Sequence, residues 1–148
     1  MKLGFLTACL PHLRLEEIAA WAAEHRFEAL EVAAWPDLGD RPFTATHIDV
    51  ADLDQAGADS IRELFDRHGL TLSSLAFYDN NLHPDPTERK AVNDHVLACI
   101  EAAARLGCPT VGTFVGRDPT RPVADNLRQA QERLGDVLKD EDLSKFIL

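Results

Sequence analysis

Residues 71–85, TLSSLAFYDNNLHPD, decide how this chain of 148 residues folds. The first half of the stretch is apolar and rich in strand-forming residues, and the second half collects side chains that can bind or catalyse: Tyr78, Asp79, Asn80, Asn81 and His83. Parallel α/β proteins place their functional groups at the carboxyl ends of strands, just before a helix. We therefore interpret this stretch as a buried strand that ends in a candidate site.

A helix is predicted directly after this strand. Asp85 stands at the N-cap, Pro86 at the first helical position and Glu88 three residues after the cap, which is a strong combination of start signals. Gly107 is expected to end the helix, and Pro109 prevents it from resuming. The stretch and its helix thus form one βα unit.

The same unit occurs four times, with predicted strands at residues 3–8 and 29–35, from residue 71 within the opening stretch, and at residues 110–116. Helices are expected over about three turns from Leu15, over residues 55–68, after Asp85, and from about Pro122, where Val123 and Leu127 should be buried. Alternating βα units imply a parallel sheet with right-handed crossovers. Four units make either a small flavodoxin-like sheet or half of a (β/α)8 barrel, which needs about 250 residues.

Composition narrows the function classes. Asp and Glu number 25 against 15 Lys and Arg, so the formal charge of −10 disfavours binding to a phosphate backbone. Three cysteines without a CxxC pair indicate free thiols in a reducing compartment. The N-terminus does not look like a signal peptide, and no apolar run reaches the ~18 residues of a membrane span. The sequence therefore predicts a cytoplasmic protein.

Four ordered segments resemble one enzyme family: EIAAWAAEHRFEALEVAAWP, THIDV, YDNNLHPD and GCPTVGTFVGRDP. They are similar to the sugar phosphate isomerase/epimerase family, which has the xylose-isomerase-like (β/α)8 TIM barrel and includes endonuclease-IV-like enzymes. The resemblance covers residues 1–130 and implies an α/β fold of four βα units, the N-terminal half of such a barrel. The acidic composition disfavours the endonuclease alternative.

The resemblance also implies a chemistry. Members interconvert aldoses and ketoses or epimerise ketoses with a divalent metal (Mn²⁺, Mg²⁺, Co²⁺ or Zn²⁺) that polarises the sugar oxygens while a glutamate moves the proton. Their metal ligands come mostly from strands after the fourth, and an IAIEN-type strand of that kind is absent here. We therefore expect the acid/base glutamate to lie in the missing half and this chain alone to show weak or no activity.

Candidate site residues in this half lie at predicted strand ends. The expected substrate-binding set, for a sugar or sugar phosphate, is Trp35, Tyr78, Asn80, His83 and Arg117, with Thr7, Phe114 and Asp118 on the same side. His47, His83 and Glu31 are candidate metal ligands. Each has a plainer alternative: rim aromatics, turn-forming asparagines, a histidine at the helix entry, and for Glu31 an inward polar layer. His95 is expected on a helix surface.

The last residues depart from the family pattern, so residues 131–148 are predicted to be a helical tail of foreign or uncertain origin. DEDLSKFIL, residues 140–148, resembles the C-terminal tail of the ATPase subunit (HslU) of the bacterial HslUV protease, which implies a fusion that docks a protease partner. The alternative is an amphipathic helix end. A further hypothesis is a half-barrel that forms a homodimer, or pairs with another chain, and so closes its open sheet edges.

Overall fold

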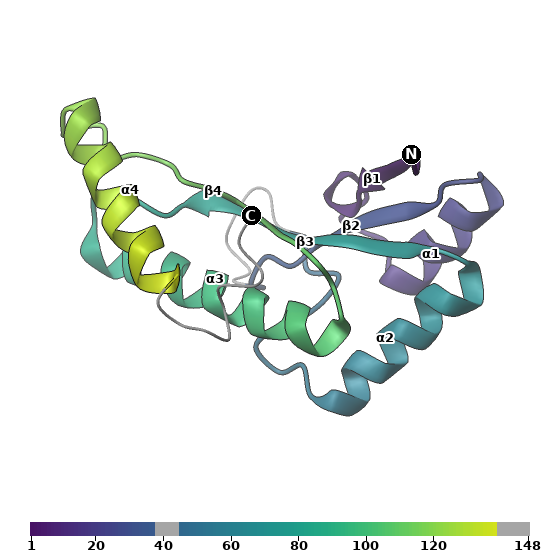
Figure 1. The fold of residues 1–148 in the computed structure, drawn as a ribbon. Coiled ribbons are helices and arrows are strands. Elements are labelled where there is room, and N and C mark those ends of the chain that lie inside the picture. Colours follow the sequence, from purple (N-terminus) through teal and green to yellow (C-terminus); the bar gives the residue numbers. More distant parts are fainter. Residues whose placement is uncertain (38–44, 139–148) are drawn as a thin grey trace.

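A computed structural model describes residues 1–37 and 45–138 (Figure 1). The strands are β1 (Gly4–Leu6), β2 (Ala29–Ala33), β3 (Thr71–Asn80) and β4 (Val111–Phe114), and a short 3-10 turn, η1 (Thr7–Cys9), follows β1. The helices are α1 (Leu15–Glu24), α2 (Gln55–His68), α3 (Pro86–Leu106) and α4 (Val123–Leu138). The four predicted βα units are confirmed.

The strand order separates the two topologies that the sequence left open. The sheet has the order β1-β2-β3-β4, and each neighbouring pair is parallel. Because right-handed crossovers that always step in one direction leave every helix on the same face, α1, α2 and α3 lie together on one side of the sheet (Figure 1). This is the arrangement of a barrel segment, since a doubly wound sheet carries helices on both faces.

The helix ends follow the predicted signals. The Asp85 carboxylate accepts hydrogen bonds from the backbone N–H groups of Thr87 and Glu88, at 2.7 and 3.1 Å, and Pro86 opens α3. Gly69 and Gly107 cap α2 and α3 in the left-handed region, with φ of 65° and 66°. Arg26, after α1, adopts the same conformation with φ of 64°. The end of α1 is therefore strained, because a non-glycine residue in this region costs roughly 1 kcal/mol.

The two faces of the sheet differ in character. Leu30, Val32 and Leu75 are fully buried in the core beneath the helices. Phe5 and Phe77 point the same way, because their rings contact Trp21 of α1 and His95 of α3. Alternate positions point to the other side. We call this other side the open face and define it by Leu6, Glu31, Ser74, Tyr78, Gly112 and Phe114.

The structure corrects two expectations about packing. Val123 and Leu127 of α4, expected in the core, are 68% and 60% exposed, because α4 lies beyond the last strand with no described strand beneath it (Figure 1). His95, expected at the surface, is partly buried, with Nε2 2.7 Å from the Ala34 carbonyl. Periodicity identifies an apolar helix face but does not show whether this chain supplies its partner.

Three further predictions concern the cysteines, membrane spans and the C-terminal tail. All three cysteines are free, as predicted; Cys9 is exposed, and burial raises the pKa of Cys99 to about 12. Among the described helices, none is long and apolar enough to span a membrane. The tail segment 140–148 lies outside the described residues, so the division at residue 131 and the tail's resemblance stay predictions.

Candidate functional site on the open face

A carboxylate and a phenol form the polar centre of the open face. Tyr78 of β3 donates a hydrogen bond to Glu31 of β2, with 2.5 Å between Oη and Oε1. Between Leu30 and Glu31 the β2–β3 register shifts, so that Glu31 pairs with Ser74. Gly112 of β4 leaves the room, because a Cβ there would lie 2.5 Å from the Tyr78 hydroxyl and 2.9 Å from Glu31 Oε1. The contact therefore depends on residues from three neighbouring strands, β2, β3 and β4.

The environment keeps the Tyr78 phenol protonated. Burial, and secondly the hydrogen bond to Glu31 and its negative charge, raise the pKa of Tyr78 to about 12. At neutral pH the phenol is therefore a permanent donor, and the second Glu31 oxygen is left as an acceptor for another hydroxyl. The pair offers one charged acceptor on a partly exposed surface.

Aromatic rings surround this pair. The Tyr78 ring lies 4.9 Å from Phe114 and 6.0 Å from Trp35, measured between ring centroids. Trp35 is 6% exposed and its ring contacts both Phe77 and Tyr78, so it forms the buried part of this aromatic cluster. Phe114 is 57% exposed, and its ring is the one that can pack on the C–H face of a sugar.

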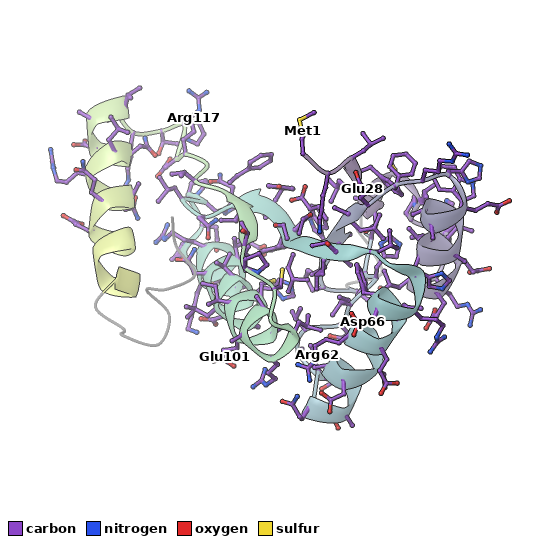
Figure 2. The ribbon with its side chains drawn as sticks, turned by 45° about the vertical axis from the view of Figure 1, so that its right-hand side comes forward. Met1, Glu28, Arg62, Asp66, Glu101 and Arg117 are labelled. Carbon is purple, nitrogen blue, oxygen red and sulfur yellow. The ribbon has the colours of Figure 1, made fainter. Side chains whose placement is uncertain are left out.

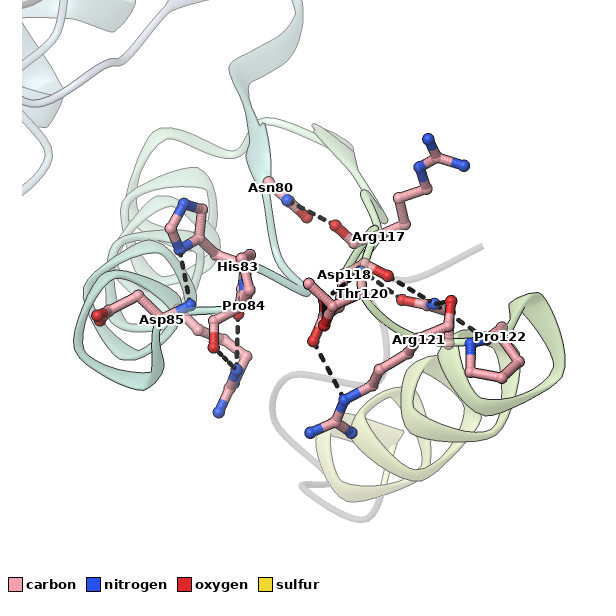
Figure 3. Close-up of polar contacts among 11 residues, drawn as sticks. Asn80, His83, Pro84, Asp85, Arg117, Asp118, Thr120, Arg121 and Pro122 are labelled. Atoms are coloured by element: carbon pink, nitrogen blue, oxygen red, sulfur yellow. Dashed lines mark hydrogen bonds and ion pairs between the residues drawn. The ribbon is translucent and has the colours of Figure 1, made fainter.

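The predicted residue Asn80 holds a loop. Its amide donates to the Arg117 carbonyl at 2.8 Å, and its oxygen accepts from the backbone N–H of Leu82 at 3.1 Å (Figure 3). Gly116 follows β4 with φ of 72°, and a Cβ there would lie 1.9 Å from Asn80 Oδ1. Asn80 therefore ties the ends of β3 and β4 together. The side chain of Arg117 is exposed and projects away from the loop (Figures 2 and 3).

Asp118 is the centre of a closed turn. It is buried and accepts from the Thr120 backbone and hydroxyl, while Arg121 pairs with its other oxygen at 3.1 Å. The hydrogen bonds from Thr120 are the main reason that the pKa of Asp118 lies below its ordinary value. The Asn126 side chain bonds the Asp118 backbone on both its N–H and its carbonyl. Asp118 thus shapes the entry to α4.

His83 lies at the start of α3. Its Nδ1 accepts from the Asp85 backbone N–H at 3.2 Å, and its carbonyl accepts from Arg89 at 2.6 Å (Figure 3). These contacts are those of a histidine at a helix entry, the plainer of the two roles considered for it.

His47 lies near the carboxyl ends of β1 and β2, where its backbone N–H bonds the Ala33 carbonyl at 3.0 Å. Its Nε2 is 3.3 Å from the Leu10 carbonyl, which can only accept, so Nε2 carries the proton. Its Nδ1 is 2.8 Å from the hydroxyl of the buried Thr7, which also accepts from the Ala33 N–H. Burial lowers the pKa of His47. His47 is thus a neutral imidazole, and the hydrogen bonds of its two ring nitrogens hold it against Thr7 and Leu10, which follow β1.

The three candidate metal ligands are not brought together. Within residues 1–37 and 45–138, no three His, Cys, Asp or Glu side chains are grouped so that they could hold a metal ion. Glu31 bonds Tyr78, while His47 and His83 use ring nitrogens for backbone or hydroxyl contacts. The described residues therefore do not fit a complete divalent-metal site.

A separate groove of about 660 Å³ lies between α1 and α2, with His47 on its wall. Leucines and isoleucines line it together with charges of both signs, including Arg14, Glu16 and Arg67. The groove contains neither the Glu31–Tyr78 pair nor the exposed ring of Phe114, and we therefore take the open face as the candidate site.

The sequence pointed to Glu31 and Tyr78 individually but not to their contact. Whether two residues on neighbouring strands face the same side depends on the register between the strands, and a shift of one residue reverses it. The register between β2 and β3 shifts between Leu30 and Glu31. Gly112 was also missed as a part of the site. A glycine inside the predicted fourth strand was the available signal, because such a glycine often marks a close approach by another group.

Comparisons with known proteins agree on one fold. The model of a family described as xylose isomerase-like TIM barrel matches residues 19–144. No curated protein gives a match. Among solved structures, D-psicose 3-epimerase with D-tagatose from Clostridium cellulolyticum H10 is 18% identical with a TM-score of 0.67, over 94% of this chain and 48% of that chain.

Two further structures extend the range of similar proteins. The IolI protein with a bound zinc atom is 17% identical with a TM-score of 0.64, over 93% of this chain and 48% of that one. The probable 3-DHS dehydratase AsbF from Bacillus anthracis is 14% identical with a TM-score of 0.62, over 90% and 46%. This chain thus spans about half the length of these barrels. Its strand order, its one-sided helices and the family match lead to one conclusion: the chain belongs to the xylose isomerase-like TIM barrel family.

Proposed function

We propose that this chain is the first half of a sugar isomerase or epimerase barrel and that its open face is one wall of the sugar pocket. The observation that carries the proposal is the Glu31–Tyr78 pair, held at 2.5 Å on the helix-free face beside the exposed ring of Phe114. Family membership supports it, as do the similar D-psicose 3-epimerases, whose structures were determined with D-fructose and with D-tagatose.

Each part of this wall has a chemical role in the proposal. The free Glu31 oxygen accepts a hydrogen bond from a sugar hydroxyl, and Tyr78 fixes the orientation of that carboxylate. Phe114 packs on the apolar side of the ring. Arg117, exposed at the mouth, suits the phosphate of a sugar phosphate. Asn80 and His83 contribute by holding the loops rather than by touching the substrate.

Metal chemistry belongs to the other half of the barrel in this proposal. IolI is described with a bound zinc atom, which suggests a divalent metal in relatives. The described residues of this chain supply no complete ligand set, so we place most ligands and the acid/base glutamate outside residues 1–37 and 45–138. We accordingly expect no turnover of sugars by this chain alone with Mn²⁺, Mg²⁺, Co²⁺ or Zn²⁺. A cytoplasmic location is part of the proposal, supported by the three free cysteines.

The test is an NMR titration of the chain with D-fructose and D-tagatose. We expect chemical-shift changes at residues of the open face, and two- to tenfold weaker binding in Glu31→Gln, about the value of one hydrogen bond. Glu28→Gln is the matched control, because Glu28 is exposed at the other end of β2. Changes centred on the α1–α2 groove, equal weakening in both variants, or measured turnover by this chain would each overturn the proposal.

A further inference from the structure

We propose that a second copy of this chain pairs with the two free edges of the sheet and closes both open faces into one eight-stranded barrel. The inference goes beyond the proposed function, because it concerns what covers the open face of this chain when no other partner is present. The association itself needs neither sugar nor metal.

The two free edges are complementary. In the sheet order β1-β2-β3-β4, β1 and β4 each have a strand neighbour on one side only within residues 1–37 and 45–138, and all pairs are parallel. A two-fold rotation about the barrel axis brings β4 of one copy beside β1 of the other, in the same parallel sense, at both junctions. Both edges are then hydrogen-bonded at once, and neither remains open.

The number of strands also fits a second copy. A barrel of this kind has eight strands and eight helices. This chain supplies four of each and covers 46% to 48% of the similar barrels described above. Two copies of the described residues therefore supply eight strands and eight helices, the number found in a closed ring.

Exposed apolar side chains lie along the same two flanks. On the α4 flank, Val123 and Leu127 are 68% and 60% exposed. On the β1 flank, Trp21 is 42% exposed although its ring packs edge-on against Phe5 of the edge strand. Adjacent helices of a barrel lie side by side in the outer ring, so closure brings α4 of one copy against α1 of the other. Each flank then covers the other's apolar surface.

Closure brings two like charges into one interior, which distinguishes this dimer from a dimer that uses another surface. Glu31 lies on the open face of both copies, so the closed interior contains two carboxylates related by the two-fold axis. Like charges brought into one interior repel each other. Glu31→Gln keeps an acceptor for Tyr78 and removes this repulsion, so it should tighten the association.

The test is sedimentation velocity of the full chain over a range of concentrations. We expect a monomer–dimer equilibrium that Leu127→Glu weakens at least tenfold and Glu31→Gln strengthens several-fold. Leu127 is exposed, so its replacement should leave the folded monomer intact, and circular dichroism checks this. Ala56→Glu on the exposed side of α2 adds the same charge away from both edges, and Glu63→Gln, also exposed on α2, removes one charge outside the open face.

Several results would overturn the proposal. A monomer at every concentration excludes self-pairing. A dimer that Leu127→Glu does not weaken, or that Ala56→Glu weakens equally, uses another surface. A dimer unaffected by Glu31→Gln does not bring the open faces together. If a dimer behaves as expected but binds no sugar, the proposed function fails while this inference stands.

Discussion

Glu31, Tyr78 and Gly112 act as a unit, because each one limits the other two. The phenol reaches the carboxylate only because position 112 carries no side chain, and the carboxylate in turn keeps the phenol protonated. A partly buried carboxylate without a hydrogen-bond donor would be costly, and Tyr78 supplies that donor. The arrangement explains how a charged residue is tolerated within the otherwise apolar strand ALEVA.

This unit predicts an unusual alkaline titration. Tyr78 is the only tyrosine, so phenolate absorbance reports on it alone. We expect a midpoint near pH 12, because the pKa of Tyr78 is raised to about 12, and a lower midpoint in Glu31→Gln, which lacks the negative charge. Since the unfolded phenol ionises near its ordinary pKa of 10, stability should fall as pH rises from about 10 towards 12. A midpoint near 10 in the folded chain, with circular dichroism unchanged, would contradict the pair.

At the scale of single elements, the helix ends show how closely local signals control this fold. Three helices end in a residue with a left-handed conformation; two use glycine, and the first uses Arg26. At that end the Phe27 N–H bonds the Ala22 carbonyl at 2.9 Å, and the Arg26 N–H bonds the Ala23 carbonyl at 3.1 Å. These are the bonds of a Schellman cap, made here with the less suitable residue.

Replacing that residue should stabilise the protein. For Arg26→Gly we expect a gain of about 0.5 kcal/mol in the free energy of unfolding, because relief of a left-handed non-glycine residue exceeds the added entropy of the unfolded chain. Urea denaturation measures it. Arg67→Gly, the same exchange inside the exposed face of α2, should instead cost about 1 kcal/mol. Equal losses in both variants would show that the Arg26 junction is not strained.

For the whole molecule, the decisive feature is that its site has one wall. The helices cover only one face of the sheet, and the polar pair with its aromatic neighbours lies on the other. In a closed barrel that face is the interior, where water is excluded and carboxylates act most strongly. In the proposed function, the second wall of the pocket comes from outside residues 1–37 and 45–138.

If a second copy supplies that wall, association should depend on salt. Each chain carries a formal charge of −10, so two copies repel at low ionic strength. Raising NaCl from about 0.01 M to about 0.15 M shortens the Debye length from about 30 Å to about 8 Å, and the dimer should become tighter. Sedimentation equilibrium of the wild-type chain at both salt concentrations measures this. Weaker association at higher salt would instead indicate attraction between opposite charges.

Much of the fold followed from local patterns. Apolar periodicity located the four βα units, and Asp85 with Pro86 located the start of α3. Patterns of this kind could not place α4, because the exposure of Val123 and Leu127 depends on which strands lie beside the helix. His95 was misplaced for a related reason. Its carbonyl partner, Ala34, is 61 residues away in sequence.

The element order and the helix caps follow from sequence patterns alone, because they depend on side chains within a few positions of one another, and the family resemblance follows from four ordered segments. The strand order, the placement of the helices on one face and the contact of Glu31 with Tyr78 are visible only in the folded chain. The physical reason is register. Residues on two strands that are separated by a helix lie on the same face only if the strands are aligned suitably. A shift of one residue would turn Glu31 away from Tyr78.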